Sequence, residues 1–452
     1  MDLNRTKDIG SSCLFAKIGT FSVLLDCGTN PKHDGYDSLP TFEKLGSSAL
    51  DLILISHCHL DHVGSLPYLM KRQQQARVLM SRASQIVLPR ILANSVSVMR
   101  LRRDEFGIRE YPFFTQTDIE SLEDHILPMQ FGKPRTFKKD SDEMTVTFFS
   151  AGHVLGASSI LIEHRHRKTF YTGDVLFRDQ RTIKGAMWPT CEVDTVITET
   201  TRGSVMPEDR RSVDSEIERL IVTIRDTIDA GGSVLIPAFA FGRMQEILKI
   251  ISDARNSNRL QKDSPIFCSG LGYGLIDDFD TVAKKLSLVN FRKKITRELG
   301  VKIFRGNDPK YIKSQIQRPS IFVLSSGMLV ENTSAYNVAC ALIDDHKNAI
   351  CFVGFCDEDT PGGELQKCSA GDSFLFKAQN YTAKISAKIH RFDLSGHASR
   401  EDILKNVLGM SPRSVVLVHG EESSRNWFMD LLIDVAPKIK VFDMDPGEEF
   451  CI

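Results

Sequence analysis

The chain has 452 residues and a net charge of −1, with 57 Lys and Arg against 58 Asp and Glu. This balance argues against a protein coated with nucleic-acid-binding surface, and the length predicts two domains rather than one core. No apolar run approaches the ~20 residues that span a bilayer, and the first ten residues do not read as a signal peptide. The ten cysteines are scattered without a C-x-x-C pair, which indicates reduced thiols. We therefore expect a cytoplasmic protein that makes no membrane contact.

Positive charge is nevertheless concentrated in two segments. Residues 71–109 hold nine Lys and Arg against two acids, a net charge of +7, and residues 284–318 hold eleven against two, a net charge of +9. Either segment could line a cleft for a polyanion, and either could equally be a solvated helix face.

Short runs rich in β-branched residues predict six strands in the first half of the chain: 21–26, 51–56, 145–150, 158–163, 168–172 and 194–199. The first two runs are apolar almost throughout, which predicts strands that are buried on both faces.

The pattern changes after Arg202. A helical apolar stripe over 213–228 is followed by an alternation of strand and helix patterns: 233–237, 242–255, 321–325 and 350–354. This alternation predicts a second α/β unit with its own parallel sheet. Near Lys384 the first pattern returns, with a helix near 401–407 and a strand at 414–420. We predict one domain built from 1–203 and 391–452, interrupted by an inserted domain at 204–390.

Polar residues gather where these predicted strands end. They are Asp26, His57, His59, Asp61, His62, His153, Asp174, Glu199, His397 and His419. In layered α/β folds, loops beyond the strand ends converge and form sites. One histidine in such a place is more often a hydrogen-bonded loop residue than a ligand, and Asp26 or Glu199 alone could be a cap or a turn residue.

The stretch HCHLDH, from His57 to His62, is different. Three imidazoles and a carboxylate within six residues are poor core material. In extended backbone His57 and His59 point to the same side, while Asp61 and His62 open the next turn and can face a neighbouring point. One metal cannot take all four ligands conveniently, but two metals can.

The pattern H-x-H-x-D-H resembles the signature of the metallo-β-lactamase superfamily. That resemblance implies an αββα sandwich, with Asp26, the HCHLDH stretch, His153 and Asp174 as successive motifs. The inserted domain, with Glu199, His397 and His419 around it and PAFAFGRMQEIL and SSGM within it, is similar to the β-CASP branch. The chain looks closest to RNA-cleaving nucleases related to the endonuclease subunit of the cleavage and polyadenylation specificity factor, in their short bacterial and archaeal form.

The resemblance also implies roles for the clustered residues. His57, His59 and His153 would hold one zinc ion; Asp61, His62 and His419 would hold a second, and Asp174 would bridge the two. Two such cations ~4 Å apart lower the pKa of a shared water and neutralise charge on a phosphate. Asp26 would orient a ligand. With Asp61 among the catalytic residues, His397 would protonate the leaving oxygen while Glu199 holds its imidazole.

For the inserted domain, the resemblance implies RNA-phosphate contacts by Arg243, Ser325, Ser326, Gly327 and Thr360. The chain departs from its relatives at Arg202, where they carry an aromatic residue, and in the loop 357–363. In that loop Asp359 stands where glycine is usual and Gly363 where a basic residue is usual. Three carboxylates near a cleft for a polyanion predict weak RNA binding, unless the loop has shifted and they face water.

The predicted function is a two-zinc ribonuclease that cuts single-stranded RNA between the two domains, in RNA processing or decay. The alternatives are a metal-dependent hydrolase of another phosphodiester or ester, and an RNA-binding subunit with vestigial activity. The oligomeric state stays open, with a homodimer as one candidate.

Overall fold

The computed structural model describes the chain except for residues 8, 207–210, 307 and 452. It divides into two compact units, described here one at a time. The first consists of Met1–Asp179, Lys184–Val205 and His397–Ile452, and the second of Gln180–Ile183 and Met206–Gly396. No helix in the described ranges is both long and apolar enough to cross a membrane.

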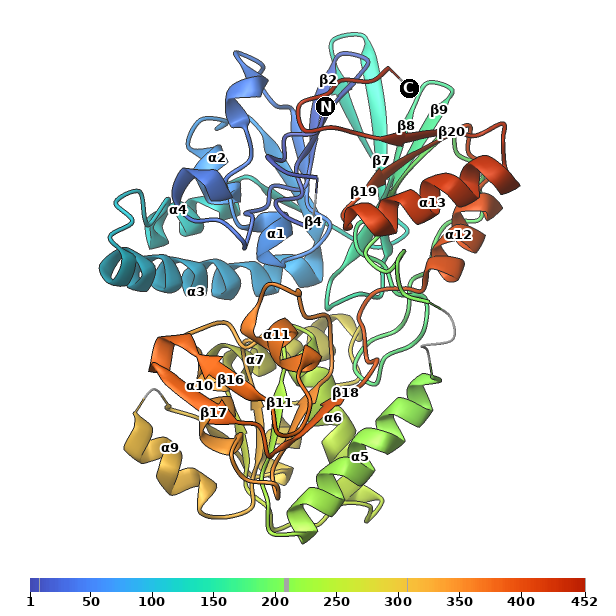
Figure 1. Cartoon of the computed structure of the whole chain (residues 1–452). Coiled ribbons are helices and arrows are strands. Elements are labelled where there is room, and N and C mark those ends of the chain that lie inside the picture. Colours follow the sequence, from blue (N-terminus) through green and yellow to red (C-terminus); the bar gives the residue numbers. More distant parts are fainter. Residues whose placement is uncertain (8, 207–210, 307, 452) are drawn as a thin grey trace. The chain divides into compact units, whose positions relative to one another are not determined.

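The first sheet of the first unit has five strands in the order β1 to β5 (Figure 1). Its strands are β1 (Leu14–Ile18), β2 (Phe21–Leu25), β3 (Leu52–Leu54), β4 (Arg77–Ser81) and β5 (Ile126–Met129). The helices between these strands are α1 (Leu60–Val63), α2 (Leu66–Met70), the long α3 (Arg82–Phe106) and α4 (Gln116–Ser121), with three short 3₁₀ turns at Gly35–Ser38, Phe42–Leu45 and Leu122–Asp124. Only β1 and β2 pair antiparallel; β2 to β5 are parallel. The predicted double-sided burial of 21–26 and 51–56 is confirmed, because β3 is wholly buried and β2 is buried except at Ser22.

The second sheet of this unit has seven strands in the order β20-β19-β10-β9-β8-β7-β6. They are β6 (Arg135–Lys139), β7 (Asp142–Ser150), β8 (Ser158–His164), β9 (Arg167–Tyr171), β10 (Thr195–Glu199), β19 (Ser414–Val418) and β20 (Lys440–Asp443). The C-terminal strands β19 and β20 therefore join the sheet made by the first half of the chain, with β19 parallel to β10. Helices α12 (Arg400–Gly409) and α13 (Glu422–Val435) belong to the same part.

The core of the first unit lies in two layers, because successive residues of a strand point to opposite faces. One apolar cluster joins the facing sides of the two sheets, for example Val23 and Leu54 with Ile160 and Ile197. A second cluster joins the other face of the seven-stranded sheet to α12 and α13, through residues such as Phe170, Val407 and Phe428. The sheets and helices of this unit are consistent with the predicted αββα sandwich.

The second unit is built around six parallel strands in the order β13-β12-β14-β11-β15-β18. They are β11 (Val234–Pro237), β12 (Ile266–Cys268), β13 (Val301–Ile303), β14 (Ile321–Leu324), β15 (Ala349–Phe352) and β18 (Lys388–Arg391). A separate hairpin is formed by β16 (Ser373–Phe376) and β17 (Tyr381–Lys384), joined by a 3₁₀ turn at Lys377–Gln379. The prediction of a second α/β unit with its own parallel sheet is confirmed.

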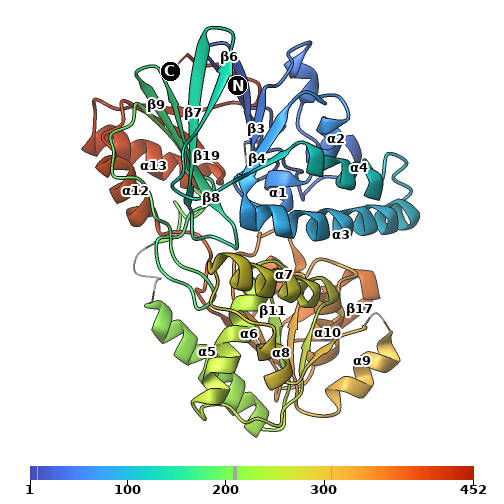
Figure 2. The same cartoon turned by 180° about the vertical axis from the view of Figure 1, so that it is seen from behind.

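The helices of the second unit are α5 (Val213–Asp229), α6 (Arg243–Asn256), α7 (Gly270–Leu286), α8 (Lys294–Glu298), α9 (Pro309–Ile316), α10 (Ser334–Leu342) and α11 (Pro361–Lys367). Helix α6 packs against α5, α7 and α8 (Figure 2). The predicted apolar stripe of α5 is the face that it buries, at Ile217, Leu220, Ile221 and Ile224.

The borders of the second unit differ from the predicted range 204–390. The chain leaves this unit only at Gly396, because Asp393 donates its backbone N–H to the buried carboxylate of Glu216 at 2.9 Å. The short segment Gln180–Ile183 also belongs to it. The carboxylate of Glu246 accepts the backbone N–H groups of Arg181 and Thr182 at 2.7 and 2.9 Å and the hydroxyl of Thr182 at 2.7 Å. No sequence pattern predicts that Gln180–Ile183 joins the second unit, because the side chain that holds this segment, Glu246, lies 65 residues after Arg181.

Candidate metal centre

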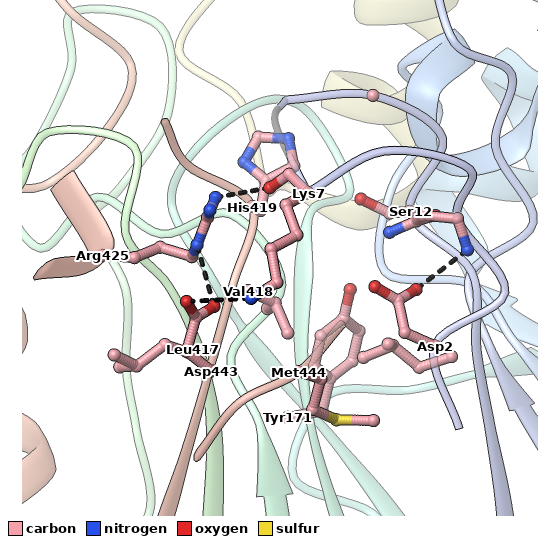
Figure 3. Close-up of a pocket in the computed structure, with 13 residues that line it drawn as sticks. Asp2, Lys7, Ser12, Tyr171, Leu417, Val418, His419, Arg425, Asp443 and Met444 are labelled. Atoms are coloured by element: carbon pink, nitrogen blue, oxygen red, sulfur yellow. Dashed lines mark hydrogen bonds and ion pairs between the residues drawn. The ribbon is translucent and has the colours of Figure 1, made fainter. Parts of the chain in front are cut away.

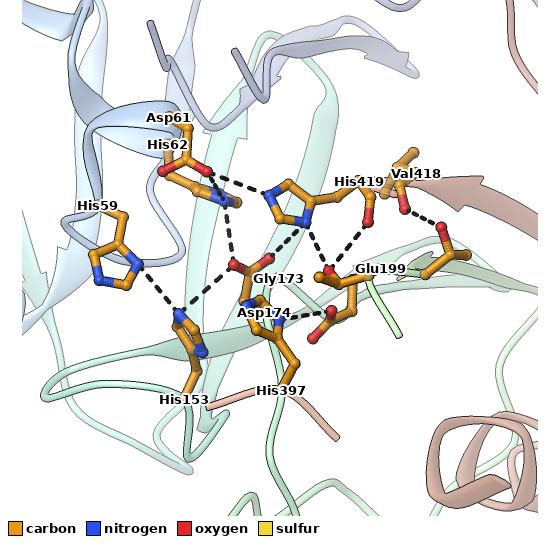
Figure 4. A network of polar contacts seen from close by, with 12 residues as sticks. His59, Asp61, His62, His153, Gly173, Asp174, Glu199, His397, Val418 and His419 are labelled. Carbon is orange, nitrogen blue, oxygen red and sulfur yellow. Dashed lines mark hydrogen bonds and ion pairs between the residues drawn. The ribbon is translucent and has the colours of Figure 1, made fainter. Parts of the chain in front are cut away.

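The structure brings the strand-end histidines and acids of the first unit together in one cluster (Figure 4). It contains His57, His59, Asp61, His62, His153, Asp174, Glu199, His397 and His419, and all of them lie in the first unit. Their ligand atoms form five overlapping groups in which every atom lies within 4.8 Å of the others.

Three imidazoles form the first part of this cluster. Nδ1 of His59 lies 3.1 Å from Nε2 of His57 and 3.2 Å from Nε2 of His153. Ligands about 2.0–2.1 Å from a tetrahedral zinc ion are separated by about 3.3 Å, which is close to both spacings. The i, i+2 relation of His57 and His59 in extended backbone therefore has the geometry that the sequence predicts.

The second part combines Asp61, His62 and His419. Oδ2 of Asp61 lies 3.3 Å from Nε2 of His419 and 3.6 Å from Nε2 of His62. Asp61 and His62 lie in the short helix α1, whereas His419 directly follows β19, more than 350 residues later.

Asp174 lies between these two parts. Its Oδ2 atom is 3.7 Å from Nε2 of both His57 and His153, and 3.5 Å from Nε2 of His62. Its Oδ1 atom is 3.5 Å from Nδ1 of His419. One carboxylate thus faces both groups of imidazoles, as a bridging ligand must.

The donor set fits divalent metal ions. Among the described residues, Nε2 of His62 and Oδ1 of Asp174 are buried and have no hydrogen-bond partner. Buried polar atoms without partners are rare in native structures, and a bound ion is one of their ordinary explanations. Imidazole nitrogens and carboxylate oxygens are also ligands that zinc prefers.

The pKa shifts show how strongly the groups of the cluster act on one another. Burial holds the pKa of His57 well below its usual value, which keeps the imidazole neutral, as a metal ligand must be. Burial acts to raise the pKa of Asp174, but the imidazolium charges of His419 and His62 outweigh it, so this pKa is lowered well below its usual range. Burial acts to lower the pKa of His62, and the charges of Asp174, Asp61 and Asp26 reverse the shift and raise it. The acids create a negative potential that favours any cation among them.

The backbone carbonyl groups of the short helix α1 anchor it to neighbouring segments of the chain. Those of Leu60, Asp61 and His62 accept backbone N–H groups from Thr29, Ser12 and Cys27 at 2.7–2.8 Å. A four-residue helix has too few internal hydrogen bonds to be stable alone. Gly28 allows this approach, since a Cβ atom there would lie 1.7 Å from the carbonyl oxygen of Asp61.

Asp26 orients His62 from behind. Its Oδ2 atom lies 2.8 Å from Nδ1 of His62, which leaves Nε2 to face the centre of the cluster. The same carboxylate accepts the backbone N–H of Ser56 at 2.6 Å, the hydroxyl of Ser56 at 2.7 Å and the hydroxyl of Tyr171 at 2.6 Å. Ser56 and Tyr171 were not predicted as part of the site, although Ser56 directly precedes His57 and Tyr171 is three residues before Asp174.

His397 and Glu199 form a hydrogen-bonded pair at the rim of the cluster. Nδ1 of His397 lies 2.8 Å from Oε2 of Glu199, and the other oxygen of Glu199 accepts the backbone N–H of Val175 at 2.6 Å. Glu199 is buried, so its carboxylate is held from both sides. His397 also lies within ligand distance of His153 and Asp174. The geometry is therefore compatible with a proton donor oriented by Glu199 and with an additional ligand.

His419 is held by contacts on both sides of its backbone. Its Nδ1 atom lies 3.0 Å from the hydroxyl of Thr201, and its φ of 50° is in the left-handed region. The next residue, Gly420, accepts a hydrogen bond at its carbonyl from the guanidinium of Arg425. Nε of Arg425 lies 2.8 Å from Oδ1 of Asp443. Figure 3 shows Arg425 and Asp443 in the small pocket beside His419.

Comparisons with known proteins agree with this geometry. A family model described as metallo-beta-lactamase superfamily domain matches residues 16–206, the Beta-Casp domain model matches 244–365, and a Zn-dependent metallo-hydrolase RNA specificity domain model matches 382–442. The chain therefore carries a metallo-beta-lactamase domain together with the Beta-Casp and RNA specificity domains. Its second unit carries the β-CASP domain that the sequence predicts.

Three relatives illustrate the match. The Endoribonuclease YSH1 of Eremothecium gossypii is 29% identical over 93% of this chain and 54% of its own length. The Cleavage and polyadenylation specificity factor 73 of Drosophila melanogaster is 28% identical over 93% of this chain and 59% of its own. The Probable RNase MJ4 of Methanocaldococcus jannaschii is 28% identical and covers 96% of both chains. This chain therefore spans just over half of the two eukaryotic relatives and nearly the whole archaeal one.

A solved structure shows the same fold at low identity. The crystal structure of a protein of unknown function from Enterococcus faecalis V583 matches with a TM-score of 0.55 and 12% identity. The match covers 98% of this chain and 96% of the chain in that structure.

The predicted RNA-binding residues of the β-CASP domain make contacts within their own unit. Arg243 is buried; its guanidinium donates to the carbonyl of Leu394 at 2.7 Å and also to the side chain of Gln180. Burial lowers the pKa of this guanidinium. Phosphate contact by Arg243 therefore stays a prediction, with two of its guanidinium nitrogens already donating within the domain.

The other predicted contacts in this unit are also engaged locally. The backbone N–H of Ser325 donates to Ser269 at 2.6 Å, and the hydroxyl of Ser326 accepts the backbone N–H of Val330 at 2.9 Å. Thr360 caps α11 by accepting the N–H of Gly363. Gly327 lies against the backbone of Phe239, with 3.1 Å between its ideal Cβ position and that nitrogen. RNA contact by these four residues stays a prediction.

The loop 357–363 leads into α11 and exposes two of its three carboxylates. Gly363 is a buried residue in the first turn of α11, where a Cβ atom would lie 2.1 Å from the carbonyl oxygen of Asp357. A basic side chain cannot replace it without moving the backbone. Asp359 is exposed, and Glu358 is exposed and pairs with Lys367 at 2.7 Å. The carboxylates of Glu358 and Asp359 therefore face water, as the alternative for this loop expects.

Proposed function

We propose that this chain is a ribonuclease that uses two zinc ions to hydrolyse RNA phosphodiester bonds. The observation that carries the proposal is the complete donor set of the first unit, with Asp174 between two groups of imidazoles. The Zn-dependent RNA specificity domain match and the printed names of the relatives, endoribonuclease and RNase, support RNA as the substrate class.

The protein side chains would divide the work. His57, His59 and His153 would hold one ion, Asp61, His62 and His419 the other, and Asp174 would contact both. When bound, two such cations lower the pKa of a water and neutralise charge on the phosphate. Asp26 keeps Nε2 of His62 turned toward the centre, because it occupies Nδ1.

His397 would supply the proton that the leaving oxygen needs. Glu199 holds Nδ1 of this imidazole at 2.8 Å, which orients the ring and turns Nε2 away from the carboxylate. An imidazole held in this way can donate a proton to the leaving oxygen from Nε2. The burial of Glu199 keeps water from competing for this contact.

A substrate panel tests the proposal. Purified protein is incubated with end-labelled single-stranded RNA, with a circular RNA of the same sequence, with single-stranded DNA and with bis(p-nitrophenyl) phosphate, each with and without a chelator. We expect chelator-sensitive cutting of both RNAs, little cutting of DNA, and recovery when zinc is added back. Cutting of the circle identifies an endonuclease. Equal turnover of DNA or of the small diester would overturn the assignment to RNA, and chelator-resistant cutting would overturn the role of metal.

The cytoplasmic location and the homodimer are separate proposals that rest on the sequence alone. Fractionation of cells and sedimentation of the purified chain would test them.

A further inference from the structure

The basic segment 284–318 of the second unit splits into two parts that differ in how their charges are used. In the first part, Lys284 and Arg292 pair with Asp280 on α7 at 2.5 and 3.0 Å, and Lys293 pairs with Asp277 at 2.6 Å. Lys294 lies 3.9 Å from Glu298. These positive charges are neutralised by acids of the same unit, so they offer little to an external polyanion.

The second part is different. Six exposed basic residues in the described part of 297–318 have no ionic partner. Arg318 donates to the carbonyl of Asp263 at 2.9 Å, and the other five are Arg297, Lys302, Arg305, Lys310 and Lys313. The acids nearby are engaged elsewhere. Glu298 faces Lys294, and Asp308 caps α9 by accepting the backbone N–H of Lys310 at 2.9 Å. We call these five residues the basic face.

The fold places the basic face around one strand. Lys302 lies on β13, which is the edge strand of the six-stranded sheet. Arg297 is in the last turn of α8, which contacts β13, and Arg305 directly follows Phe304, whose ring packs on Tyr311 of α9 at 5.3 Å. Lys310 and Lys313 are three residues apart on α9 and so lie on the same side of it.

The basic segment of the first unit, residues 71–109, also contains both paired and unpaired cations. There, Arg102 pairs with Asp34 at 2.8 Å, Arg103 with Asp104 at 2.9 Å and Lys71 with Asp118 at 3.1 Å. In the described structure the exposed arginines of that segment without an ion pair, Arg72, Arg77, Arg82, Arg100 and Arg109, are spread over 72–109, whereas the unpaired cations at β13 lie closer together in the chain, within 297–313.

We propose that the basic face binds the phosphate backbone of single-stranded RNA, apart from the metal centre. The inference rests on the proposed function, because that function supplies a polyanionic substrate. Lysines and arginines without partners release counterions when they meet phosphates, which gives affinity without sequence preference. An edge strand adds backbone N–H groups, which also contact phosphates in nucleic-acid complexes. The competing explanation is that Lys302 only protects an exposed edge, beside Ile303, from pairing with another sheet.

Two triple variants with equal charge change separate these explanations. The test variant carries Lys302→Gln, Lys310→Gln and Lys313→Gln; the control carries Lys284→Gln, Lys293→Gln and Lys294→Gln. Both remove three lysines from the same unit, but only the control residues are ion-paired. Each is made in an Asp174→Ala background, so that the probe, a labelled 30-nucleotide poly-uridine RNA, is not cut. The measurement is the dissociation constant by fluorescence anisotropy over a range of salt concentration.

Each lost phosphate contact lowers the slope of log affinity against log salt by about 0.7 for single strands, so we expect the test variant to lose about 2 and the control much less. Equal slopes in the two variants would overturn the inference, including the case in which the test variant self-associates while its slope is unchanged. A poly-glutamate peptide that binds the parent more tightly than RNA would overturn the choice of partner.

The outcome is distinguishable from failure of the proposed function. If the parent cuts RNA in a chelator-sensitive manner and both slopes are equal, only the basic face is refuted. If the parent does not cut RNA but the slopes differ, the basic face stands and the catalytic proposal fails.

Discussion

Polar residues in loops and at the ends of helices and strands make up both the metal cluster of the first unit and the predicted phosphate contacts of the β-CASP domain. The two sets differ in what their polar atoms contact. In the first unit, Nε2 of His62 and Oδ1 of Asp174 are buried without a hydrogen-bond partner in the described structure. In the second unit, the guanidinium of Arg243 donates hydrogen bonds to Leu394 and Gln180, and Thr360 caps α11. A polar residue at a strand end serves a ligand only when the fold leaves its polar atoms unused.

The largest effect should come from removing a shared ligand of the cluster. We expect His57→Ala and Asp174→Ala to reduce cleavage to background, because each takes away a donor that the other residues cannot replace. Elemental analysis after chelator-free purification should find about two zinc ions per parent chain, as two tetrahedral sites require, and fewer in each variant. His166→Ala, at an exposed turn outside the cluster, is the matched control and should keep both ions. A parent without any transition metal would refute the metal centre.

His397→Ala should come next. If His397 donates a proton, the variant should keep its metals and lose about 10²–10⁴-fold in rate, which is the range for acid–base groups. A substrate whose leaving group needs no proton should recover most of this loss, and Glu199→Gln should give a milder version, because it weakens the contact with Nδ1. Loss of zinc from His397→Ala would instead identify a ligand, consistent with its closeness to His153 and Asp174.

Arg243→Met tests the other side of the comparison. The substitution leaves the carbonyl of Leu394 and the side chain of Gln180 without their donor, and each unsatisfied group costs about 1–3 kcal/mol. We therefore expect the free energy of unfolding in urea to fall by about 2–4 kcal/mol, with no change in the salt dependence of RNA binding. If the variant keeps normal stability but loses salt-dependent affinity for RNA, Arg243 contacts RNA after all.

Thr201→Val should have the smallest effect of the four. Valine keeps the shape of the side chain but removes the hydroxyl that lies 3.0 Å from Nδ1 of His419. Loss of such an orienting partner typically weakens metal affinity by about 10–100-fold. Competition with a chromogenic chelator should show this weakening at one of the two metal positions, and Thr201→Ser should restore it. Equal weakening in the serine variant would mean that the methyl group, through packing, holds the histidine.

The sequence alone predicted most of what lies along one stretch of chain. The strands β2, β3, β8, β9, β10 and β19 lie within a residue or two of their predicted ranges, because short β-branched runs bounded by polar residues are a local property. The long helix α3 and the strands β4 and β12 were not identified. Helix α3 carries arginines on its exposed side and Pro89 inside it, so its pattern does not differ clearly from that of a solvated loop.

HCHLDH was predictable as a metal-binding stretch because its spacing in extended backbone and in the following turn is set by chain geometry. The structure places its ligand atoms 3.1–3.5 Å from their nearest partners. Only the tertiary structure could show which further residues hold these ligands in place. Ser56 and Tyr171 behind Asp26, Thr201 behind His419, and the burial of Arg243 and Gly363 all depend on contacts between segments far apart in sequence. The same is true of the basic face: composition counts positive charges, but whether an acid neutralises each of them depends on which side chains folding brings within ~4 Å.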